Sequence, residues 1–180
     1  MVGRGPLFDG EGHYVVRRGE IVESSIPHPP VASADRLYLV SVSGAPEFRS
    51  LYEALSAMAF YNLSPAVIRE VQAPDAGSRL LRDGRNLASV LGRLESDAPD
   101  ALQRVKDYLA KLAPGVEDVS REALAHKETI AFRQTVKGSK HPWKFYAGSM
   151  SDGTLRALGV LVALTQAADS THPVSLVGIE

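Results

Sequence analysis

The sequence predicts a mixed α/β fold, and three patterns support this prediction. Apolar residues recur at helical spacing over residues 47–59 and 97–112. Two short runs, 129–136 and 143–147, have the composition of a β-hairpin. A long apolar helix precedes an apolar strand at the end of the chain. With 180 residues the chain can bury a core of its own, so we expect a single α/β domain in which helices cover a sheet.

Residues 1–45 are expected to be rich in β-structure. Residues 14–17 and 20–23 flank Arg18-Gly19 and predict a hairpin with a tight turn. Residues 24–34 contain three prolines and predict a stiff connector. Residues 36–42 combine β-branched and aromatic side chains, which predicts a buried strand.

Residues 46–125 are expected to be mainly helical. After the amphipathic helix at 47–59 comes a short apolar strand at 60–63, and Ser64-Pro65 is a typical helix start. Asn86 is expected to cap the next helix, and Pro99 to begin another that ends at Pro114-Gly115. These two helices predict a helical insertion over residues 86–125.

Residues 126–180 are expected to hold the hairpin, a buried helix and a core strand. Ser151 is a good N-cap, and the carboxylate of Asp152 complements the dipole of the helix that follows. Gly153 lets other groups approach the backbone closely. Arg156 is expected to pair with Asp152, one helical turn before it.

The final strand, residues 174–180, is an uninterrupted apolar run that ends in a carboxylate. Such runs are typical of strands inside a parallel sheet covered on both faces. Ligands bind at the carboxyl ends of such strands in open α/β sheets, so Glu180 stands where a magnesium nucleotide would be held.

Composition excludes several classes of protein and site. The chain has no cysteine, which excludes disulfides, thiolate zinc sites and cysteine nucleophiles. No apolar run has the length of a membrane span, and no signal peptide is recognised, so we expect a cytoplasmic protein. The five histidines share no ligand spacing, and no Gly-x-Ser-x-Gly elbow is present.

Four stretches together resemble one family. Ser149-Met150-Ser151-Asp152-Gly153-Thr154-Leu155-Arg156 resembles the signature motif of ABC-type ATPase heads, with Ser-Asp-Gly-Thr in place of Ser-Gly-Gly-Gln. Residues 174–180 resemble a Walker B strand, and residues 60–65 and 83–91 fit the same group. The combination, from about residue 60 to Glu180, resembles the RecF/SMC-like ATPases, often described as AAA domains of the ABC class.

The resemblance implies a nucleotide-binding role for Ser151, Asp152, Gly153 and Thr154. In ABC heads this motif closes over ATP held by the opposite subunit, so a homodimer through ATPase heads is expected. Glu180 would contact Mg²⁺ through water, and Mg²⁺ and ATP would be the cofactors of the parent protein. The acid that positions the attacking water would follow Glu180, so no catalytic residue is assigned in the printed sequence.

No Gly-x-x-x-x-Gly-Lys-Ser/Thr P-loop occurs in the sequence. The chain is therefore interpreted as a partial P-loop NTPase lobe, lacking Walker A and ending at the Walker B strand. We expect it to be inactive by itself, to hold no nucleotide tightly, and to self-associate through an open sheet edge. The alternative is a non-catalytic interaction or regulatory module with a degenerate ATPase fold.

Two further motifs have simple structural interpretations. Asp83-Gly84-Arg85-Asn86 resembles a family motif, but a type I turn followed by an N-cap explains it. A basic group with one aromatic residue is expected to be a solvated hairpin loop, and contact with nucleic acid or a partner protein is the weaker alternative. Its members are Lys137, Lys140, His141, Trp143 and Lys144.

Overall fold

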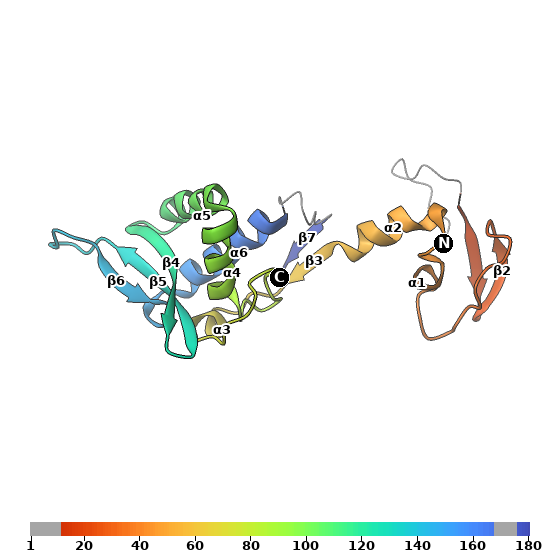
Figure 1. Cartoon of the computed structure of the whole chain (residues 1–180), viewed down its shortest axis with the longest axis horizontal. Coiled ribbons are helices and arrows are strands. Elements are labelled where there is room, and N and C mark those ends of the chain that lie inside the picture. Colours follow the sequence, from red (N-terminus) through yellow and green to blue (C-terminus); the bar gives the residue numbers. More distant parts are fainter. Residues whose placement is uncertain (1–11, 168–175) are drawn as a thin grey trace. The chain divides into compact units, whose positions relative to one another are not determined.

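The computed structural model describes residues 12–167 and 176–180. The chain divides into two compact units, Met1–Met58 and Ala59–Glu180, drawn in red to orange and in yellow to blue in Figure 1. Both units contain helices and strands, which confirms the mixed α/β class. The boundary between the units falls between Met58 and Ala59.

The first unit begins with the hairpin that the sequence predicts. β1 (Tyr14–Arg17) pairs antiparallel with β2 (Glu20–Ser24). Arg18 has φ 53° and Gly19 has φ 82°. Two consecutive residues with positive φ are the mark of a two-residue turn whose twist matches that of the strands.

The predicted strand at 36–42 is wrong, because this segment contains a short helix. α1 (Tyr38–Val42) buries Tyr38, Leu39 and Val42, which share one helical face. The Tyr38 ring lies 4.9 Å from that of Tyr14, whose ring is also 5.3 Å from Phe48 in α2 (Pro46–Ser56). α2 itself was predicted, as residues 47–59.

The second unit contains a three-stranded antiparallel sheet. Its strands are β4 (Val116–Leu124), β5 (Lys127–Gln134) and β6 (Trp143–Tyr146), in that order. β5 and β6 confirm the predicted hairpin. β4 corrects the prediction of a helical insertion that reached residue 125.

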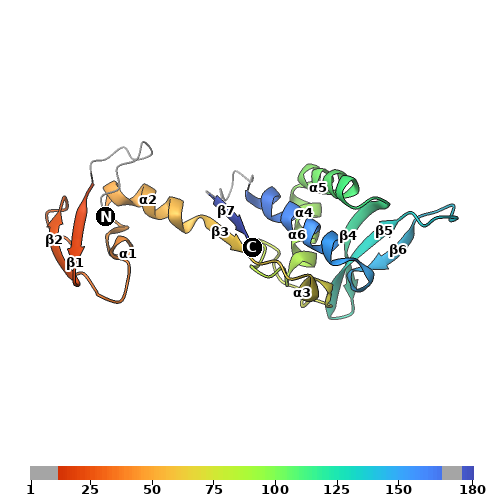
Figure 2. The same cartoon turned by 180° about the vertical axis from the view of Figure 1, so that it is seen from behind.

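Helices cover one face of this sheet and build the core. α4 (Leu87–Asp97) and α5 (Pro99–Leu112) pack against the face that carries Val119, Ile130 and Phe132, all with 0% exposure. α6 (Asp152–Ala167) packs on α5 and on α3 (Pro65–Arg69), as the view from behind in Figure 2 shows. The predicted burial of the long apolar helix is confirmed for the face that carries Leu155, Leu158 and Val162, whereas Leu164 is 50% exposed. Burying one large aliphatic side chain fully stabilises a fold by about 1.5–3 kcal/mol.

The strand predicted at 174–180 is observed as β7 (Leu176–Ile179), while residues 174 and 175 lie outside the described residues. β7 pairs with β3 (Met58–Tyr61), the strand predicted at 60–63. Burial on both faces is wrong, because Leu176 is 50% exposed and Ile179 is 39% exposed. Only Val177 of this strand packs against the core. None of the helices in the described ranges is long and apolar enough to cross a membrane.

Candidate functional site

The signature turn, residues 149–154, forms the N-terminus of α6. The 3₁₀-helix η1 (Ala147–Ser149) leads into it. Ser151 caps the helix as predicted: its hydroxyl accepts a hydrogen bond from the Thr154 N–H at 3.1 Å, and its carbonyl accepts one from the Leu155 N–H at 3.1 Å. The hydroxyls of Ser151 and Thr154 lie 2.9 Å apart and hydrogen-bond to each other.

The turn leaves hydrogen-bond donors open to solvent. Within the described ranges, no acceptor is bonded to the N–H of Asp152 or of Gly153. Ser151, Asp152 and Gly153 are all exposed, and a Cβ added at Gly153 would come no closer than 3.9 Å to its nearest neighbour. Free N–H groups at a helix N-terminus are the groups that bind an anion.

Arg69, at the end of α3, holds the signature turn in place. Its guanidinium donates to the carbonyl oxygen of Met150 at 3.1 Å and to the carboxylate of Asp152 at 2.5 Å. The predicted pair between Arg156 and Asp152 is therefore wrong. Arg156 instead donates to the main-chain carbonyl of Glu180. Arg69 lies so far from Asp152 in the sequence that no local pattern predicts their contact.

Glu180 follows β7 and lies beside α6 through this bond to Arg156. Its N–H donates to the carbonyl of Tyr61 in β3 at 3.0 Å. Its carboxylate is 72% exposed and lies 3.5 Å from the guanidinium of Arg82. Within the described part of the chain, no hydrogen bond or ion pair joins Glu180 to the four predicted nucleotide-binding residues, Ser151, Asp152, Gly153 and Thr154.

Glu180 is a lone candidate for a magnesium contact. The described residues contain no group of three or more His, Asp or Glu side chains that could hold a metal ion. Mg²⁺ keeps several waters and is commonly bound by one or two carboxylates together with substrate phosphates. Glu180 therefore fits a magnesium ion only if that ion arrives with a nucleotide.

The Asp83–Asn86 motif forms a turn, as the simpler interpretation expects. The Asp83 carboxylate pairs with Arg85 at 2.7 Å, and this hydrogen bond holds the pKa of Asp83 below its ordinary value. The prediction that the Asn86 side chain caps α4 is wrong. That amide instead binds the loop before the helix: it accepts from the Leu81 N–H at 2.9 Å and donates to the Asp75 carboxylate at 2.8 Å.

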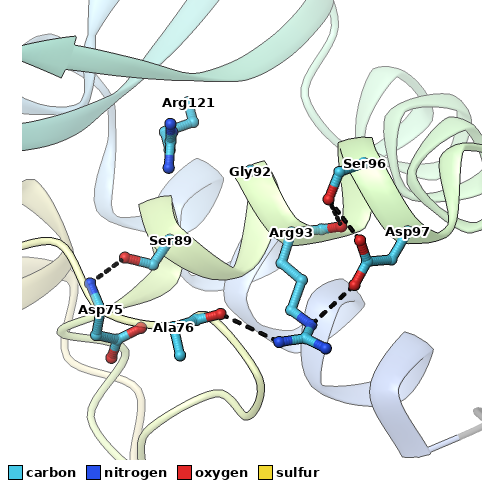
Figure 3. Close-up of a pocket in the computed structure, with 8 residues that line it drawn as sticks. All are labelled: Asp75, Ala76, Ser89, Gly92, Arg93, Ser96, Asp97 and Arg121. Carbon is cyan, nitrogen blue, oxygen red and sulfur yellow. Dashed lines mark hydrogen bonds and ion pairs between the residues drawn. The ribbon is translucent and has the colours of Figure 1, made fainter.

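A polar hollow of about 390 Å³ lies beside α4, in a region that the sequence analysis did not single out. Figure 3 shows its two arginines: Arg93 is bonded to Asp97 and to the Ala76 carbonyl, while Arg121 lies over Gly92. The remaining lining residues are Asp75, Ser89 and Ser96.

A buried polar network lies behind this hollow. Glu128 is 2% exposed, and its carboxylate accepts a hydrogen bond from the hydroxyl of Ser89. Its other carboxylate oxygen lies 3.6 Å from Arg121. The backbone N–H and carbonyl of Glu128 exchange hydrogen bonds of 2.9 and 2.7 Å with Gln72. The sequence contains a signal for this buried carboxylate. Side chains alternate between the two faces of a strand, so Glu128 lies on the same face as the apolar residues Ile130 and Phe132.

Comparison of the chain with protein-family models, with curated proteins and with solved structures finds no match.

Proposed function

We propose that this chain contributes the signature half of an ATP-binding site in an ABC-class, RecF/SMC-like ATPase with a P-loop NTPase type of fold. The observation that carries the proposal is the signature turn. It presents the hydroxyl of Ser151 and the free N–H groups of Asp152 and Gly153 to solvent at the start of a 16-residue helix.

These groups suit the terminal phosphate of ATP. The aligned peptide dipoles of α6 place partial positive charge at this end of the helix. The carboxylate of Asp152 would repel a phosphate, but the guanidinium of Arg69 at 2.5 Å offsets its charge. The turn can therefore accept an anion without rearranging.

The rest of the nucleotide would be bound by a second ATPase head, in a homodimer. The P-loop that cradles the β-phosphate would have to come from a segment of the parent ATPase other than the printed sequence, because the printed sequence contains none. Mg²⁺ would arrive with ATP, and Glu180 would contact it through water. The chain alone should bind ATP weakly and hydrolyse none.

A titration followed by NMR tests this proposal at the residues concerned. Addition of Mg-ATP at millimolar concentration to the ¹⁵N-labelled chain should shift the amide signals of residues 151–154. Ser151→Arg should abolish these shifts, because its side chain blocks the turn. Ser50→Arg, the same change at an exposed serine of α2, should leave them unchanged. If the signals of the turn do not move, or if Ser151→Arg binds as well as the unchanged chain, the proposal is wrong.

One observation favours the alternative, a non-catalytic interaction or regulatory module. The guanidinium of Arg82 lies 3.5 Å from the Glu180 carboxylate and competes with a cation for it. If this module interpretation holds, Arg82→Ala should not increase the affinity for Mg-ATP. If the ATPase interpretation holds, that change should strengthen the magnesium-dependent part of binding.

A further inference from the structure

The loop that joins β5 to β6 is a concentrated basic surface on a chain with a net charge of −1. We call residues 135–143 the hairpin tip; it projects away from the helices of its unit in Figure 2. No Asp or Glu occurs between Glu128 and Asp152, whereas Lys137 and Lys140 lie in the tip itself. Clustered cations of this kind attract phosphate groups.

The hairpin tip is held in shape by its own hydrogen bonds. The N–H of Ser139 donates to the Val136 carbonyl at 2.9 Å, and Gly138 between them has φ 88°, as a tight turn requires. The hydroxyl of Ser139 donates to the carbonyl of His141 at 2.6 Å and accepts from the indole N–H of Trp143 at 3.0 Å.

Trp143 is a fixed and exposed aromatic surface. Its side chain has its only polar group satisfied by Ser139, yet the residue is 58% exposed. A large aromatic ring that is this exposed and also held in one orientation is suited to stacking. Trp143 is the only tryptophan of the chain.

The two lysines of the tip are available to bind a ligand. Across the described ranges, neither Lys137 nor Lys140 has an ion pair or a hydrogen bond through its side chain. Lys144, on the neighbouring strand, is different, because its ammonium lies 2.7 Å from the carboxylate of Glu122. Among the described residues, the lysines that share the hairpin tip with Trp143 are therefore without an ion pair.

We propose that the hairpin tip binds single-stranded nucleic acid, with a base stacked on Trp143 and phosphates bound by Lys137 and Lys140. An exposed aromatic ring together with two lysines indicates the class of ligand. The carboxylates of an acidic peptide would use the cations and leave the ring without a partner, whereas every unpaired nucleotide offers both a phosphate and the flat face of its base. A base inside a duplex is already stacked on both sides, so its face is not accessible.

The fluorescence of Trp143 gives a direct test with the full 180-residue chain. Titration with an oligothymidylate of about 12 nucleotides should quench the single tryptophan, and inorganic polyphosphate should not. Two phosphate contacts predict that log K falls with log[salt] with a slope of about −1.4, at about 0.7 per contact. Binding of the oligonucleotide without quenching, or equal affinity for polyphosphate, would overturn the proposal, as would no binding.

Variants separate stacking from charge, with a labelled oligonucleotide followed by anisotropy. Trp143→Ala should lower the affinity roughly 5- to 150-fold, and Trp143→Phe should restore most of it because a benzene ring still stacks. Lys137→Ala should make the salt slope less steep by about 0.7. Lys127→Ala should change neither quantity, because Lys127 is exposed, lies at the other end of β5 and has no ion pair with any described residue. If Lys127→Ala has the same effect as Lys137→Ala, the binding is diffuse and the proposal is wrong.

Discussion

Replacing Glu128 by alanine should destabilise the Ala59–Glu180 unit by about 2–5 kcal/mol. The hydroxyl of Ser89, which is 3% exposed, would lose its acceptor, at a cost of about 1–3 kcal/mol. The buried Cγ methylene would also be lost, at about 0.8 kcal/mol. The ion pair with Arg121 adds at most about 1 kcal/mol, because that side chain is 45% exposed and its nearest nitrogen lies 3.6 Å from the carboxylate.

The same reasoning ranks two companion variants. Glu128→Gln keeps an oxygen that can accept the bond from Ser89 and keeps the side-chain volume, so it should lose about 1 kcal/mol or less. Arg121→Ala should also lose about 1 kcal/mol or less, since it removes only the exposed partner.

Urea unfolding followed by the fluorescence of Trp143 measures the loss of unfolding free energy that each of the three variants causes in the Ala59–Glu180 unit. Trp143 lies in β6, which pairs with the strand that holds Glu128, so its signal reports on this sheet. The reasoning would be refuted if Arg121→Ala were as damaging as Glu128→Ala, because the ion pair would then dominate. A loss for Glu128→Gln equal to that for Glu128→Ala would refute it equally, because the retained acceptor would have contributed nothing.

Four further substitutions probe turns of the Ala59–Glu180 unit. Gly77→Ala should destabilise the fold by about 2–4 kcal/mol in chemical denaturation, since φ is +61° and the new Cβ would lie 2.3 Å from a main-chain oxygen of α4. Gly138→Ala is the control: φ is +88° there as well, but nothing lies within 4 Å of the new Cβ, so it should lose only about 1 kcal/mol. Equal losses for the two variants would show that the contact between the new Cβ and α4 does not determine the cost. Arg69→Ala should cost about 1–2 kcal/mol and broaden the NMR signals of the signature turn, whereas sharp, unmoved signals would show that the turn needs no support. Folding lowers the pKa of Asp83 from its ordinary 3.8 through its bond to Arg85, so the resulting stabilisation is complete above that value and is lost as pH falls through the folded pKa. Asp83→Asn should therefore make the free energy of unfolding depend less on pH in the acid range. An unchanged pH dependence would show that Asp83 does not cause it.

The sequence was informative wherever a local rule decides the structure. The hairpin around Arg18-Gly19, the cap at Ser151 and the start of α3 at Ser64 were all predicted, and each depends on residues within one turn. The segment 36–42 shows where local rules fail. Its β-branched residues favour a strand, but packing of Tyr38 and Val42 against the unit's small core selects a five-residue helix.

β4 was missed for a geometric reason. A bulge between Val116 and Asp118 shifts the register, so that Val116 and Val119 are both buried although they lie three residues apart. Three is the spacing of one helical face rather than of a strand, and the neighbouring Glu, Arg and Ala residues are good helix formers. An irregularity visible only in strand pairing therefore disguised the strand as the end of a helical region.

The candidate site shows the same division between local and distant information. The sequence identified Ser151, Gly153 and the first-turn carboxylate of Asp152, all within one turn of α6. A carboxylate there favours the helix and opposes a bound phosphate, because both are anions at the same positive end. Arg69 resolves this conflict by pairing with Asp152 and with the Met150 carbonyl, while the N–H groups of Asp152 and Gly153 have no bonded acceptor among the described residues. The property that makes the turn suitable for phosphate thus depends on a residue of α3 that only the fold brings to it.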